Sequence, residues 1–133
     1  MYPTFLTLDE VIEIQRDLIE RYGGSPGIRD QGLLESAVAM PQAGLGEQYL
    51  HSSVFEMAAA YLFHIVKNHP FVDGNKRTGA MAAFTFLKLN QLTLNAGELQ
   101  FERLVRAAAE GKLGKEKIAE FFQKNCHFGN RTS

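Results

Sequence analysis

Apolar positions near the start of the chain recur at the three- and four-residue spacing of amphipathic helices. Thr7 and Glu10 form a capping-box pattern, and the apolar positions that follow predict a helix that stops at Gly23. Asp30 can cap a second, short helix that runs to Met40, where a proline ends it. The first part of the chain is therefore predicted to be helical.

Two later segments are apolar on nearly every side. The first follows the capping-box pattern of Ser53 and Glu56 and runs to about residue 68, and the second covers residues 80–89. A helix that is apolar all round is buried in the middle of a domain. We therefore expect a buried central pair of helices, and small residues such as Gly79 would let the two helices approach closely.

The remaining elements complete an all-α prediction. Two amphipathic helices are expected at about 98–110 and 115–125, and the polar tail from His127 is expected to be frayed. Strand candidates are confined to residues 92–94 and a stretch within 42–50, which otherwise reads as a mobile loop. The pattern thus predicts a compact bundle of about six helices around the central pair.

Length, charge and cysteine content narrow the class of protein. A chain of 133 residues forms one domain, residues 1–133, and its apolar fraction of 45% argues against disorder. The net charge of −1 argues against a whole-molecule nucleic-acid or anionic-membrane binder. The single cysteine allows no internal disulfide, and neither a signal peptide nor a membrane span is indicated. We expect a cytoplasmic protein with no membrane contact and no direct nucleic-acid binding.

The loop between the two most apolar helices, residues 69–79, is the segment with candidate chemistry. Pro70 disfavours the helical conformation at His69, so the preceding helix should end there. An Asp-Gly-Asn turn follows, and the next helix should begin near Asn75 or Lys76. Its first backbone N–H groups have no partner within the helix.

Cations stand in the first turn of this helix, where they are unfavourable. Lys76 and Arg77 each cost a few tenths to about 1 kcal/mol beside the positive end of the helix dipole. With the free N–H groups they predict an anion site, most simply for phosphate. Asp73 suits Mg²⁺ held mainly by substrate phosphates, His69 is a candidate general base, and Phe71 would anchor the loop in the core.

The same residues admit other interpretations. Each one alone has a structural explanation, but all of them on one loop favour phosphoryl or nucleotidyl transfer. Residues 74–79 spell G-x-x-x-x-G, yet neither Lys-Ser/Thr nor a preceding strand completes a P-loop. A metal site of His64 with the loop's histidine and aspartate is weakly indicated. Cys126 with His127 offers a thiol, but adjacency in sequence does not make a catalytic pair.

At this loop the sequence resembles the Fic/Doc family, whose motif is H-x-F-x-[D/E]-G-N-G-R-x-x-R. The matching positions are His69, Phe71, Asp73, Gly74, Asn75 and Arg77. Residues 26–37, PGIRDQGLLESA, are similar to the N-terminal signature of the Doc (death-on-curing) branch. The resemblance covers most of the chain and implies a single Fic/Doc domain with the all-α Fic/Doc fold.

Two departures from the motif bear on the reaction. Lys76 replaces the second glycine and Ala80 replaces the final arginine. Typical Fic enzymes transfer AMP from ATP to a hydroxyl, whereas Doc toxins, which share the Lys-Arg-Thr pattern, transfer the γ-phosphate to a threonine of elongation factor Tu and halt translation. Doc proteins usually have alanine at the position of Gly74, which leaves adenylylation as an alternative.

The resemblance implies a role for each residue of the loop. His69 would take the proton from the target hydroxyl, Asp73 would hold Mg²⁺, and Phe71 would anchor the loop. The residues implied to bind the phosphates of ATP are Gly74, Asn75, Lys76 and Arg77. No inhibitory helix of the family is found in the chain, so a partner antitoxin of the prevent-host-death type is expected, in a bacterial or phage-encoded pair. A non-catalytic anion- or nucleotide-binding module is a further alternative.

Overall fold

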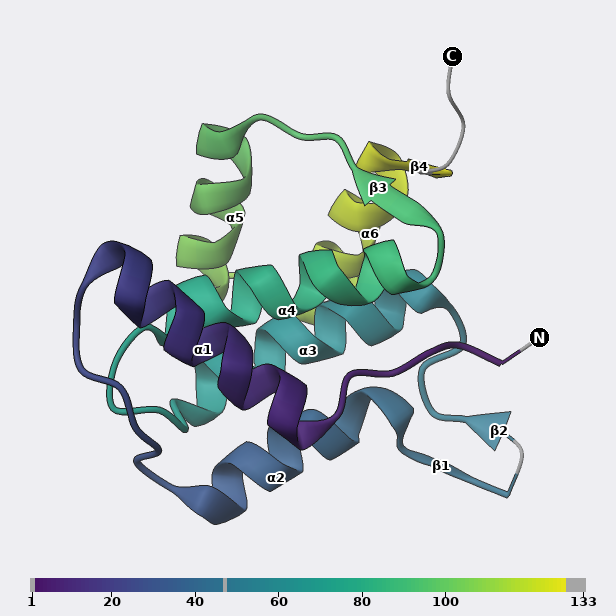
Figure 1. Ribbon diagram of the computed structural model, residues 1–133. Coiled ribbons are helices and arrows are strands. Elements are labelled where there is room, and N and C mark those ends of the chain that lie inside the picture. The colour runs from purple at the N-terminus through teal and green to yellow at the C-terminus, as the bar shows by residue number, and fades with distance from the viewer. Residues whose placement is uncertain (1, 47, 129–133) are drawn as a thin grey trace.

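A computed structural model describes residues 2–46 and 48–128 as six α-helices, one short 3₁₀ turn and four short strands (Figure 1). The helices are α1 (Leu8–Tyr22), α2 (Gln31–Ala39), α3 (Val54–Asn68), α4 (Asn75–Leu89), α5 (Glu98–Ala109) and α6 (Lys115–Asn125). The predicted all-α fold is confirmed. Among the described helices, none combines the length and apolar character that crossing a bilayer requires.

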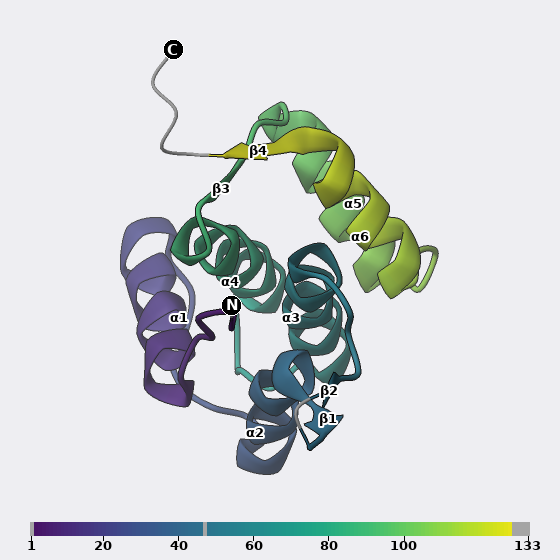
Figure 2. The same cartoon turned by 90° about the vertical axis from the view of Figure 1, so that its right-hand side faces the viewer.

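Helices α3 and α4 form the centre of the molecule, as the sequence predicts. In Figure 2 they lie side by side, with α1 and α2 on one side and α5 and α6 on the other. Their packing is the most extensive between any two elements described. At Gly79 an added Cβ would lie 3.0 Å from Val66 Cγ2 and 3.3 Å from the Leu62 carbonyl oxygen, so this close approach favours glycine.

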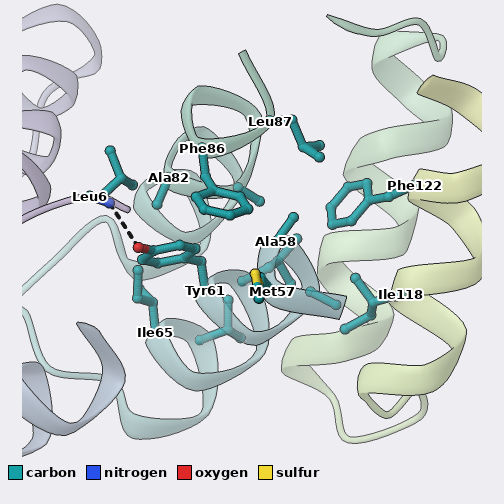
Figure 3. Close-up of a cluster of buried hydrophobic side chains, with 14 of the residues drawn as sticks. Leu6, Met57, Ala58, Tyr61, Ile65, Ala82, Phe86, Leu87, Ile118 and Phe122 are labelled. Atoms are coloured by element: carbon teal, nitrogen blue, oxygen red, sulfur yellow. Dashed lines mark hydrogen bonds between the residues drawn. The ribbon is translucent and has the colours of Figure 1, made fainter. Parts of the chain in front are cut away.

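The core is built on the facing sides of this pair and is closed by α6 (Figure 3). Tyr61 of α3 and Phe86 of α4 are fully buried and tilt together, with ring centroids 5.1 Å apart. The Tyr61 hydroxyl accepts a hydrogen bond from the Leu6 backbone N–H at 2.8 Å. This bond satisfies a buried phenol and ties the N-terminal segment to the core.

The helix caps follow the sequence closely, with one difference. Thr7 Oγ1 accepts from Glu10 N–H at 3.1 Å, and the Glu10 carboxylate accepts from Thr7 N–H at 2.8 Å, which completes the predicted box. Ser53 also caps its helix, but the Glu56 carboxylate takes the N–H and hydroxyl of Ser52 instead of the Ser53 N–H. The second box is therefore only half formed.

The strands correct one prediction. The predicted segment 92–94 forms β3 (Leu92–Leu94), and 42–50 holds the hairpin of β1 (Gly44–Leu45) and β2 (Gln48–Tyr49). The expected frayed tail is wrong at its start, because Cys126–Phe128 form β4, antiparallel to β3. Pairing with β3 supplies the backbone partners that a polar sequence alone could not indicate; the rest of that tail lies outside the described residues.

A cluster of two histidines and a lysine joins α3 to the start of α6. Lys115 Nζ lies 3.1 Å from His64 Nε2 and 3.3 Å from His51 Nε2. An ammonium group only donates, so both Nε2 atoms accept and both rings are neutral. Burial, and then the charge of Lys115, lower the pKa of His64 to about 4 and also lower that of His51, against a smaller opposing effect of Glu56.

This cluster predicts a loss of stability in mild acid. Because the pKa of His64 is lower in the folded chain, the unfolded chain binds more protons between about pH 6.5 and 4. The stability present above pH 6.5 should therefore fall as the pH drops through this window. Urea unfolding at pH 7 and pH 5 should show a smaller loss for His64→Gln than for the wild type. His127→Gln, on exposed β4, is the control and should retain the full loss.

Candidate active site

The loop that joins α3 to α4 begins at His69 in an unusual backbone conformation. Helix α3 ends at Asn68, as predicted, but His69 has φ 50° and ψ 53° rather than an extended backbone. Pro70 disfavours the right-handed helical region but favours an extended backbone, so Pro70 alone does not account for the left-handed conformation. It costs of order 1–3 kcal/mol for a residue other than glycine, so surrounding contacts must hold it. The His69 side chain is exposed.

Phe71 and Asn75 hold the middle of the loop. Phe71 is fully buried and forms an isolated bridge with Ile28, which confirms its predicted place in the core. The Asn75 side chain clamps the Phe71 backbone: Oδ1 accepts from the Phe71 N–H at 3.0 Å, and Nδ2 donates to the Phe71 carbonyl at 3.0 Å. The side chain of Asn75 is thus committed to the loop, and only its backbone N–H is left for a phosphate.

Asp73 presents an exposed carboxylate beside the start of α4. Its Oδ2 accepts from the Ser25 N–H at 3.2 Å, and its Oδ1 accepts from the Gly74 N–H at 2.9 Å. Buried Gln15 of α1 donates from Nε2 to the Asp73 carbonyl oxygen at 3.1 Å and so fixes the backbone below the carboxylate. Each carboxylate oxygen keeps lone pairs that can serve a hard cation, so this residue fits a magnesium ion shared with phosphates.

The start of α4 lacks both a side-chain cap and an acidic first turn, whereas each of the other described α-helices has at least one of the two. Its N-cap is Gly74, with φ 72°, and the first intrahelical bond runs from Thr78 N–H to the Gly74 carbonyl at 2.9 Å. The N–H groups of residues 75–77 precede that bond and have no partner by helix geometry. With Lys76 and Arg77 exposed beside them, this helix end is electropositive.

Arg77 is positioned by an aromatic ring from α1. Its guanidinium carbon lies 4.5 Å from the centroid of Tyr22, a cation–π contact. Tyr22 is 61% exposed, and one face of its ring supports the guanidinium in a cleft that both residues line. The contact limits the directions that Arg77 can take without neutralising its charge.

One cleft of about 1170 Å³ gathers these groups. Its lining includes six of the seven predicted site residues: His69, Asp73, Gly74, Asn75, Lys76 and Arg77. Phe71 is absent from the lining because it lies in the core beneath the loop. Residues of α5 also line the cleft, among them Arg106 and its ion-pair partner Glu102, and Ala80 lines the cleft where the family motif has an arginine.

Two of the competing sequence interpretations, the His64 metal site and the Cys126 nucleophile, find no support in the geometry. His64 contacts Lys115 rather than joining His69 and Asp73, and no group of three potential metal ligands occurs among the described residues. Cys126 is partly buried, and burial raises the pKa of its thiol to about 11, so it is protonated at neutral pH and a poor nucleophile.

Three residues that support the site were not predicted. Gln15 interrupts the apolar face of α1, and a buried polar residue in an apolar stripe is a signal that could have indicated it. Arg29 donates to the backbone carbonyl oxygens of Asn68 and His69. It lies within the signature segment 26–37, but no local pattern there reveals these partners. Tyr22, at the end of α1, could not be assigned to Arg77 without the tertiary structure.

The chain belongs to the Fic/Doc family, because the sequence model described as Fic/DOC family matches residues 5–87. The chain is 45% identical over 75 residues to "Toxin Doc" of Mycolicibacterium smegmatis, and this alignment covers 56% of this chain and 58% of that protein. It is 32% identical over 117 residues to "Protein kinase doc" of Escherichia phage P1, and this alignment covers 87% of this chain and 90% of that protein. The similarity therefore lies with the Doc branch, as the sequence predicts.

Proposed function

We propose that this protein is a Doc-type toxin that transfers the γ-phosphate of ATP to a threonine hydroxyl of elongation factor Tu and so halts protein synthesis. The observation that carries the proposal is the cleft in which an imidazole, a carboxylate and an uncapped, cationic helix start meet. The names of the two relatives, a toxin and a protein kinase, support the same reaction.

The chemistry assigns one task to each group. His69 takes the proton from the threonine hydroxyl, whose oxygen forms a bond to the γ-phosphorus while the bond from that phosphorus to the bridging oxygen breaks and ADP leaves. The free N–H groups of residues 75–77, with the side chains of Lys76 and Arg77, stabilise charge on the phosphates. Asp73 holds Mg²⁺, which neutralises part of that charge when bound.

The structure around Gly74 weakens the case for adenylylation. Its φ of 72° favours glycine, and an added Cβ would lie 3.3 Å from Ile19 Cδ1. Glycine is therefore explained by the backbone and need not indicate AMP transfer. Lys76 and Ala80, which depart from the adenylylating motif, line the same cleft. The backbone explanation for Gly74 and the two departures from the motif together favour phosphate transfer over AMP transfer.

The partners follow from the proposed reaction. A toxin of this type acts in the cytoplasm, where its translation-factor target lies, and requires neutralisation by a separate antitoxin of the prevent-host-death type. Exposed apolar side chains from several elements, Tyr22, Val72, Met81 and Leu99, line the cleft beside the site. Exposed apolar side chains of this kind mark a surface that binds another molecule, and a protein substrate or an antitoxin segment could bury them.

Labelled ATP tests the reaction directly. Purified protein with Mg²⁺ and a bacterial lysate should transfer label from γ-labelled ATP, and none from α-labelled ATP, to a band of the size of elongation factor Tu. Removing Mg²⁺ with a chelator should reduce the transfer to background, because the phosphate charge is then unneutralised. Mass spectrometry of the band should find a phosphothreonine.

Two other outcomes would change the assignment. Label from the α position would establish adenylylation and remove the argument from Lys76 and Ala80. Binding of ATP without label on any protein of the lysate would support a non-catalytic nucleotide-binding module. In each case a cooperative unfolding transition must show that the purified protein is folded.

A further inference from the structure

The unfavourable left-handed conformation of His69 must be stabilised by its surroundings, and two hydrogen bonds from Arg29 can do so. Arg29 Nε donates to the His69 carbonyl oxygen at 2.6 Å, and its Nη2 donates to the Asn68 carbonyl oxygen at 2.9 Å. These carbonyls lie at the C-terminal end of α3, where the helix leaves acceptors unpaired and carries partial negative charge.

The backbone around Arg29 holds the other side of the same turn. The N–H groups of Arg29 and Asp30 both donate to the Pro70 carbonyl oxygen, at 2.7 and 3.0 Å, and the Val72 N–H donates to the Gly27 carbonyl oxygen at 3.0 Å. Segment 27–30 therefore runs along the loop as a strap. Without the Arg29 side chain these backbone bonds could still form, but no other hydrogen bond within residues 2–46 and 48–128 reaches the carbonyls of residues 68 and 69.

We propose that Arg29 is a positioning residue for His69. Its planar guanidinium spans two successive carbonyls and so fixes the peptide planes on both sides of the His69 Cα. Those planes set the direction of the Cα–Cβ bond, and with it the position of the imidazole relative to the phosphates in the cleft. The activity part of this inference rests on the proposed function, whereas the conformational part does not.

Arg29→Ala tests the proposal by kinetics. A misplaced catalytic group costs up to about 100-fold, so we expect kcat to fall by about 10- to 100-fold with the KM for ATP nearly unchanged. Added guanidinium, well below denaturing concentrations, should restore part of kcat by filling the vacated place. Arg29→Lys should be intermediate, because one ammonium lacks the planar fork. The matched control is Arg16→Ala, which removes an exposed arginine of α1 that is ion-paired with Glu13 and should retain wild-type kcat.

A nuclear magnetic resonance measurement makes the proposal independent of activity. The ¹³Cα and ¹³Cβ chemical shifts of His69 report its backbone conformation and should move away from left-handed values in Arg29→Ala, less so in Arg29→Lys. Unchanged shifts, or an unchanged kcat in a folded Arg29→Ala, would overturn the proposal. If the wild type itself transfers no phosphate, the proposed function fails, while the shifts still decide whether Arg29 sets the conformation of His69.

Discussion

Replacing His69 with alanine is expected to abolish phosphate transfer and toxicity while leaving the fold intact. A positioned general base contributes about 10²- to 10⁴-fold to a rate, and His69 is the imidazole that lines the cleft with Asp73 and the start of α4. Its side chain is exposed, so its loss removes little buried surface. The rate of γ-label transfer and the survival of cells expressing the variant measure the effect.

Two further variants separate catalysis from backbone effects. Asparagine adopts the left-handed conformation more readily than alanine, so His69→Asn should keep the backbone at φ 50° and still be inactive. His127→Ala, an exposed histidine of β4 outside the cleft, should retain full activity. Toxicity that persists in a folded His69→Asn protein would remove this residue from the mechanism.

Among the substitutions proposed for this protein, replacing Phe71 with alanine is expected to lower the free energy of unfolding most. The ring is fully buried beneath the loop, and truncating such a side chain costs about 3–5 kcal/mol of unfolding free energy through lost burial and the cavity left behind. Activity should fall as well, because without the buried ring the backbone of residue 71 is held less firmly. The side chain of Asn75, the first residue of α4, binds that backbone. Urea unfolding and label transfer report the two effects.

Neighbouring substitutions control for the effect of Phe71→Ala. Phe71→Leu keeps much of the buried volume and should lose considerably less stability. Val72→Ala alters the adjacent side chain, which is 50% exposed, and should leave the unfolding midpoint nearly unchanged. A Phe71→Ala protein with the wild-type midpoint would show that the loop is anchored by its backbone bonds alone.

The sequence by itself predicted the elements whose causes are local. The Thr7 cap, the Asp30 cap and the end of α3 before Pro70 follow from side chains and backbone restrictions within a few residues. The central pair followed from apolar character on all sides of two helices. The loop with His69 and Asp73 was found for the same reason, since its chemistry lies within nine residues of sequence, from 69 to 77.

The tertiary structure decided everything that depends on partners far apart in the chain. Strand β4 pairs with β3 across an intervening pair of helices, and no local pattern in Cys126–Phe128 encodes that partner. Gln15 reaches the Asp73 carbonyl, and Arg29 reaches those of residues 68 and 69, because folding brings α1 and the strap against the loop. Local sequence fixes which donors and acceptors exist, but the packing of the helices determines which of them meet.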